Sequence, residues 1–115
     1  MNQTGSRVTT HVLDAALGRP AQGVPVRLEQ RAGGGWSAIA AGNTNSDGRV
    51  TDFGPADLDA GVYRVSFDTA SYFVATEQVG FYPEVVITFS LADPEAHYHI
   101  PLLLSPYAFT TYRGS

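Results

Sequence analysis

Seven side chains in this 115-residue sequence are of types that carry out acid–base or anion-binding chemistry. They are His11, Arg49, His97, His99, Tyr112, Arg113 and Ser115. Histidine exchanges protons near neutral pH, and the arginine guanidinium forms paired hydrogen bonds with planar oxyanions or ureides. Taken together, the set predicts a site for a planar anion. Taken singly, His11 reads as a surface or hydrogen-bonded residue and Arg49 as a solvated charge.

A metal site and a serine nucleophile are two alternative interpretations of the same residues. His97 and His99 stand two apart, so on a strand they share one face, a spacing found in many metal sites. Three histidines could hold Zn²⁺ with an open fourth position, as in a hydratase. No carboxylate stands at a matching spacing, so we expect no metal and no other cofactor. No Ser-His-Asp grouping or nucleophile elbow surrounds Ser115, which argues against a serine nucleophile.

Composition narrows the classes of protein. The net charge of −4 and the pI near 5.1 argue against a nucleic-acid partner, which requires a basic face. No apolar stretch reaches the roughly 18 residues of a membrane span, and the start carries no signal sequence, so we expect a cytoplasmic protein without a membrane partner. The absence of Cys excludes disulfides and thiolate chemistry. The charged fraction of 16% is low and suggests that other subunits cover part of the surface.

Short runs of Val, Thr, Tyr and Phe, separated by 12 Gly and 7 Pro, are typical of an all-β sandwich or barrel. We expect one domain over residues 1–115. Strands are predicted at 7–14, 24–31, 36–44, 62–68 and 85–92, with further strand in the final segment and turns at 14–23, 33–35, 45–48 and 57–61. The one helical candidate is 69–78, capped by Asp68 or Thr69.

These elements place the candidate residues. By alternation, His11 lies on the more polar face of the first strand, and Arg49 is the first residue after the turn at 45–48. Leu102, Leu103 and Leu104 are consecutive, so both faces of their strand must be buried, and one face needs another molecule. Pro101 has no N–H for a ladder and predicts a bulge or an edge. A last strand is expected within 107–111, directly before the terminal Tyr-Arg-Gly-Ser.

Three segments carry a resemblance to a known family. They are HVLDAALGRPA at 11–21, TNSDGRVTDF at 44–53 and FYPEVVITFSLADPEAHYHIPLLLSPYAFTTYRGS at 81–115. Through them the chain resembles the 5-hydroxyisourate hydrolases, transthyretin-related proteins of purine catabolism, over essentially its whole length. The terminal tetrapeptide is the most specific of these signals. Phe109 and Thr110 depart conservatively from the Tyr-Ser that is usual there.

The resemblance implies an all-β, transthyretin-like (prealbumin-like) β-sandwich of two four-stranded sheets with one short helix. It implies a homotetramer with active sites in a channel between dimers. The implied catalytic residues are His11, Arg49, His99 and Ser115, and the implied substrate contacts come from His11, Arg49, Tyr112, Arg113 and Gly114. His97 is assigned a supporting role. The implied reaction is hydrolysis of 5-hydroxyisourate at its N1–C6 bond to 2-oxo-4-hydroxy-4-carboxy-5-ureidoimidazoline, with either His11 or His99 as the base.

Two other functions compete with the hydrolase. Transthyretin has the same fold but is a carrier of thyroid hormone, and it lacks the terminal Tyr-Arg-Gly-Ser. The Gly- and Pro-rich pattern over 12–67 also resembles small accessory β-sandwich modules, in which these residues serve turns alone. Neither alternative explains why the segment from His97 to Ser115 concentrates histidine, tyrosine and arginine.

Overall fold

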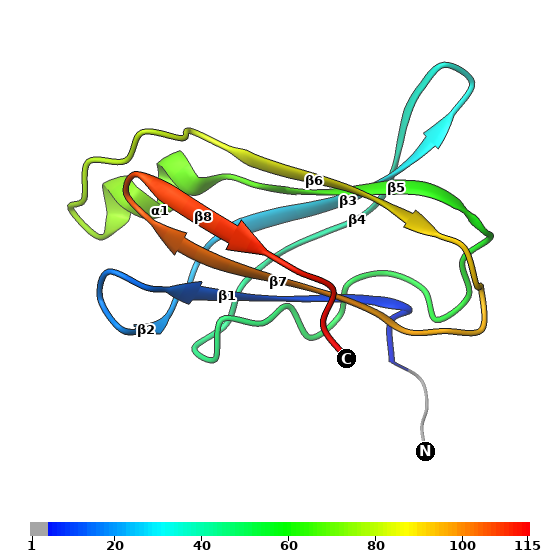
Figure 1. The fold of residues 1–115 in the computed structure, drawn as a ribbon, viewed down its shortest axis with the longest axis horizontal. Coiled ribbons are helices and arrows are strands. Elements are labelled where there is room, and N and C mark those ends of the chain that lie inside the picture. Colours follow the sequence, from blue (N-terminus) through cyan, green and yellow to red (C-terminus); the bar gives the residue numbers. More distant parts are fainter. Residues whose placement is uncertain (1–4) are drawn as a thin grey trace.

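The computed structural model describes residues 5–115, and its eight strands form two four-stranded sheets with one short helix (Figure 1). Sheet A contains, in spatial order, β2 (Arg19–Pro20), β1 (Val8–Asp14), β7 (Tyr98–Ser105) and β8 (Ala108–Thr111). Sheet B contains β4 (Gly35–Asn43), β3 (Pro25–Ala32), β5 (Gly61–Phe67) and β6 (Val85–Leu91), and α1 (Thr69–Ala75) connects β5 to β6. The predicted transthyretin-like sandwich is confirmed.

Alternation along the strands builds the core. On β1 every second residue from Val8 to Asp14 is buried, while the residues between them are half-buried on the outer face of sheet A. On β5, Tyr63, Val65 and Phe67 point inward as expected. The two inner faces enclose one apolar cluster, whose largest fully buried members are Tyr63, Phe53, Phe67, Leu28, Leu91, Leu102 and Leu104.

The centre of sheet A is a parallel pair. β1 and β7 run in the same direction, with Thr9 opposite His99 and His11 opposite Pro101. All other strand pairs in the sandwich are antiparallel. Figure 1 shows β1 and β7 side by side, with β8 leading back along β7 to the C-terminus. Residues from the two ends of the chain therefore meet on one outer face.

The helix is shorter than predicted. α1 ends at Ala75, although the pattern suggested a helix to residue 78. Asp68 is the N-cap, since its side chain accepts a hydrogen bond from the Ser71 amide. At the other end the Thr76 hydroxyl donates to the Tyr72 carbonyl, and Glu77 adopts a left-handed φ of 57°, which stops the helix. Within 5–115 no helix is long and apolar enough to span a membrane; the cytoplasmic location stays a prediction.

Two features of sheet A differ from the sequence expectation. The region 14–23 was expected to be a turn, but Arg19 and Pro20 form β2 and pair with Asp14 and Leu13. Pro101 was expected at a bulge or an edge, but it lies in an inner strand with β1 on one side. Leu102 and Leu104 are buried in the core, whereas Leu103 is only half-buried on the outer face.

A buried carboxylate joins sheet A to the helix. Asp14 is 1% exposed and accepts hydrogen bonds from the Tyr72 hydroxyl at 2.6 Å and the Gln78 amide at 3.1 Å. The amides of Ala16 and Leu17 donate to its other oxygen. Burial alone would raise the pKa of Asp14, but these four donors outweigh it and hold that pKa below its ordinary value. Burial and the contact with Asp14 raise the pKa of Tyr72.

We expect Tyr72→Phe to lower the free energy of unfolding by about 1–3 kcal/mol, because a buried carboxylate loses one of its donors. Urea denaturation followed by circular dichroism measures this. Tyr107→Phe is the matched control, since Tyr107 is 69% exposed, and its effect is expected to stay within about 0.5 kcal/mol. Equal effects of the two substitutions would show that the Asp14–Tyr72 contact does not hold the helix on the sheet.

Candidate active site on the outer face of sheet A

His11 and Arg49 are brought together by a backbone contact. His11 lies half-buried on the outer face of β1, and Arg49 pairs with it in an isolated antiparallel bridge. The Val12 amide donates to the Gly48 carbonyl at 2.7 Å. The segment at 48–49 therefore covers the edge of β1 beside the short strand β2.

The close approach requires glycine at position 48. Gly48 has a φ of 77°, and a Cβ at this position would lie 2.3 Å from the Val12 carbonyl oxygen and 3.3 Å from the His11 ring. Asn45 shapes the turn, because its side-chain oxygen accepts from the amides of Asp47 and Arg49. Arg49 is thus fixed at its backbone, while its exposed side chain stays free to reach toward the outer face.

His99 joins this face from the neighbouring strand. It lies half-buried on β7, opposite Thr9 in the parallel register. The Thr9 Oγ1 atom lies 2.8 Å from His99 Nδ1 and 2.8 Å from His97 Nε2. One hydroxyl therefore bridges two histidines.

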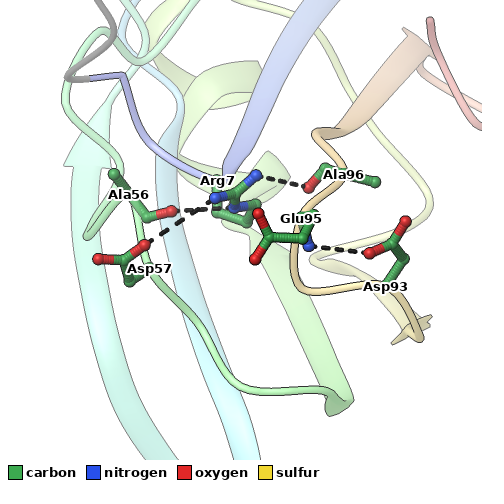
Figure 2. Close-up of polar contacts among 6 residues, drawn as sticks. All are labelled: Arg7, Ala56, Asp57, Asp93, Glu95 and Ala96. Atoms are coloured by element: carbon green, nitrogen blue, oxygen red, sulfur yellow. Dashed lines mark hydrogen bonds and ion pairs between the residues drawn. The ribbon is translucent and has the colours of Figure 1, made fainter.

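Arg7 holds the segment that precedes His97. Its guanidinium donates to the carbonyl of Ala96 at 3.1 Å and to that of Ala56 at 2.9 Å (Figure 2). The Arg7 carbonyl accepts from the Tyr98 amide. The ion pair with Asp57 spans 4.0 Å to a fully exposed carboxylate and adds little. Arg7 thus fixes the backbone on both sides of His97, which leaves the exposed His97 ring against Thr9.

The C-terminal tail returns to β7 at Gly114. The Gly114 amide donates to the His99 carbonyl at 2.9 Å, in the same register as β8 with β7. That register places Tyr112 opposite Pro101, whose missing N–H leaves a gap in the ladder. The Pro101 carbonyl accepts a hydrogen bond from the Thr111 hydroxyl. A Cβ on Gly114 would lie 2.4 Å from His99 Cδ2, so the tail lies directly against the edge of the ring.

Strand parity divides the tail between the two faces. Tyr112 is 59% exposed, and parity puts it on the side of His99, although it also lines one pocket with Tyr98 and Arg113. The Arg113 guanidinium lies 4.5 Å from the ring centroid of Tyr98, a residue of the inner face. The predicted substrate contact of Arg113 would require its side chain to leave Tyr98, and it stays a prediction. Ser115 is exposed beyond Gly114.

The surroundings lower the pKa of two histidines in the site, His11 and His99. The pKa of His11 is lowered, first by burial and then by the Arg49 charge, against a smaller raising effect of the Asp47 backbone. The pKa of His99 is lowered by burial, then by Arg49 and by the other two histidines. Neutral imidazoles beside a permanent cation can accept protons while the arginine binds an anion.

The structure thus gathers His11, Arg49, His99 and the backbone of Gly114, with His97 bound through Thr9. Sequence reasoning placed Thr9 on the face of His11 but gave it no role, because its contact with His99 depends on a strand register that only the fold defines. Over residues 5–115 no group of three or more His, Cys, Asp or Glu side chains is arranged to hold a metal ion.

The chain is similar to known proteins over nearly its full length. A model described as the HIUase/Transthyretin family matches residues 8–114. A relative named 5-hydroxyisourate hydrolase 2, from Rhizobium meliloti (strain 1021), is 45% identical over 123 residues and all of both chains. A solved structure of Klebsiella pneumoniae 5-hydroxyisourate hydrolase has a TM-score of 0.84 at 33% identity, over 94% of this chain and 97% of that one. Transthyretin from Sparus aurata has a TM-score of 0.87 at 32% identity, over 94% and 96%.

The Gly48 contact generates a test of how Arg49 is positioned. Gly48→Ala should cost at least about 2 kcal/mol of stability and displace Arg49, because the new methyl group meets the β1 backbone and its φ is disfavoured. Gly18→Ala is the matched control, since its φ is 71° and no atom lies within 4 Å of the added Cβ. It should cost only about 1–2 kcal/mol. Urea denaturation compares the two, and equal losses would contradict a steric requirement at position 48.

Proposed function

The chain belongs to the HIUase/Transthyretin family, and we propose that it is a 5-hydroxyisourate hydrolase. The observation that carries this proposal is the grouping of His11, Arg49 and His99 on one outer face, with Gly114 against the His99 ring. The relatives named as hydrolases support it, since they match at 40–45% identity over most of the chain. The fold alone does not decide the question, because transthyretin shares it.

The proposed reaction opens the six-membered ring of 5-hydroxyisourate. A neutral histidine, His11 or His99, takes a proton from water as the water oxygen forms a bond to C6. Arg49 stabilises the negative charge that develops on the carbonyl oxygen. The C6–N1 bond then breaks, and N1 receives the proton that the histidine holds, which gives 2-oxo-4-hydroxy-4-carboxy-5-ureidoimidazoline. The lowered pKa values of both histidines suit this role.

The tail is proposed to close the site. Tyr112 and the Gly114 backbone contact the ring of the substrate, and Ser115 assists catalysis at the edge of the site. This rests on the position of Gly114 against His99 and on the exposure of Tyr112 on the same side. Arg113 supports the tail from the inner face through its contact with Tyr98.

We further propose that the chain forms a homotetramer through the outer face of sheet A. Leu13 and Leu103 lie opposite each other there and are only half-buried within one chain. Apolar side chains beside the polar cluster favour a second copy of the chain as their cover.

Arg49→Lys should lower kcat/KM for 5-hydroxyisourate by about 100-fold or more, because lysine keeps the charge but loses the planar pair of donors. Urate oxidase generates the unstable substrate in place, and its absorbance decay is followed with and without the protein. Arg31→Lys, at an exposed arginine on the opposite sheet, is the matched control and should leave the rate unchanged.

A chain ending at Thr111 should lose the acceleration in the same assay while it keeps its folded core, since residues 112–115 are largely exposed. A chelator should have no effect. If the folded wild-type protein does not accelerate the decay, the hydrolase proposal fails, and a ligand screen of the outer face tests the carrier function.

Light scattering should give a mass close to four times the 12.3 kDa chain. Leu103→Glu should reduce that mass without unfolding the chain, because its side chain points away from the core and a carboxylate in a protein interface is costly. Ala38→Glu, on exposed β4, serves as the control and should remain tetrameric. A wild-type monomer would remove the tetramer proposal and leave the hydrolase proposal intact.

A further inference from the structure

The bridge between His97, Thr9 and His99 constrains the positions of protons in the site. The Thr9 hydroxyl has one hydrogen and two lone pairs, and it lies 2.8 Å from one ring nitrogen of each histidine. It cannot donate to both nitrogens. If it donates to one, it accepts from the N–H of the other.

Two arrangements keep the Thr9 hydrogen within the bridge, and they give His99 opposite chemistry. In the first, Thr9 donates to His97 Nε2 and accepts from His99 Nδ1–H, which leaves a lone pair on His99 Nε2. In the second, His97 Nε2–H donates to Thr9, Thr9 donates to His99 Nδ1, and the proton of His99 sits on Nε2. Of these two, only the first leaves His99 Nε2 able to accept a proton from water. If both rings donate to Thr9, that lone pair is also left, but the Thr9 hydrogen must then turn away from the bridge.

The surroundings of His99 leave Nε2 as the ring nitrogen that can accept a proton. The Cδ2 edge of the ring faces Gly114, and Nδ1 is occupied by Thr9. Among the hydrogen bonds of residues 5–115, none goes to His99 Nε2. The charged or titratable groups that act on the ring are Arg49, from the 45–49 turn, His11, on β1, and His97.

We propose that Thr9 and His97 are positioning residues that set the tautomer of His99, with His97 Nε2 accepting the Thr9 hydrogen so that His99 Nε2 can act as the base. The inference rests on the proposed function and assigns the general base to His99. A side chain at position 97 that can only donate cannot accept the Thr9 hydrogen, which removes the first arrangement.

His97 lies beside one charged side chain, which is held by its own hydrogen bonds. A pocket beside it is lined by Ser6, Arg7, Thr9, Thr51 and Ala56. Arg7 is the one charged residue among these, and its guanidinium is already bound to the carbonyls of Ala56 and Ala96. The hydroxyl of Thr9 is therefore the direct link between the hydrogen-bonding role of His97 and the ring of His99.

Two substitutions at His97 compare a side chain that can accept a hydrogen bond from Thr9 with one that can only donate. His97→Gln offers a carbonyl oxygen that can accept from Thr9, so turnover should persist. His97→Lys offers donors only and should lower kcat/KM by about 10–100-fold at every pH, as the loss of a ring-orienting partner does. Thr51→Lys adds the same charge in the same pocket without contacting the Thr9 hydroxyl and should leave turnover unchanged.

Substitutions at Thr9 test the hydroxyl itself. Thr9→Val keeps the shape but removes the bridge, and it should lower kcat/KM by about 10–100-fold and remove the dependence on His97. Thr9→Ser keeps the hydroxyl, so it should retain kcat/KM and its dependence on His97. Nitrogen NMR of labelled histidines reads the tautomer without any substrate: wild-type His99 should carry its proton on Nδ1 at pH 8, and on Nε2 in His97→Lys.

The outcomes distinguish this proposal from the proposed function. If wild-type His99 holds its proton on Nε2 at pH 8, or if its tautomer ignores His97→Lys, the bridge does not act as proposed, whatever the activity. Unchanged kcat/KM and pH profile in Thr9→Val would overturn it as well. A wild-type protein that shows the predicted tautomers but no hydrolysis would refute the hydrolase and retain the bridge.

Discussion

In sheet A the first strand of the chain pairs in parallel with the seventh, and this register sets the geometry of the whole site. Thr9 faces His99 and His11 faces Pro101, although about ninety residues of chain separate each pair. Side chains on a strand alternate between faces, so a slip of one residue would move His99 into the core and Tyr98 onto the outer face. The buried inner residues of β1 and β7 prevent that slip, which means that the core fixes the chemistry.

The positions of Arg49 and of the C-terminal tail depend on backbone contacts that only glycine permits. Gly48 brings Arg49 to the edge of β1, and Gly114 brings the tail against His99. Pro101 has the opposite effect. Because it has no N–H, the backbone pairing with β7 is interrupted between the end of β8 and Gly114. The polar face is therefore rigid where its backbone is paired and open at Tyr112, between these points.

The alternation of apolar residues was enough to predict an all-β sandwich or barrel and the outward position of His11, and the family resemblance narrowed the fold to the transthyretin-like sandwich. The sequence could not reveal which strands pair, so the contact between Thr9 and the two histidines was missed. β2 was missed because a strand of two residues has no periodicity, and α1 was predicted too long because Thr76 and Glu77 end it by local hydrogen bonding and a left-handed φ. Arg113 was grouped with Tyr112 by sequence, yet parity places their side chains on opposite faces.

Transthyretin shares this fold, so the sandwich itself does not specify catalysis. The chemistry of this chain lies in what the outer face of its sheet A carries. An acidic chain with a net charge of −4 gathers three histidines and an arginine on one face, and burial together with the Arg49 charge lowers the pKa of His11 and of His99. A surface that only bound an anion would gain from protonated histidines. Neutral imidazoles beside a fixed cation attract an anion less strongly than protonated ones. They can accept a proton from water, which is what hydrolysis requires.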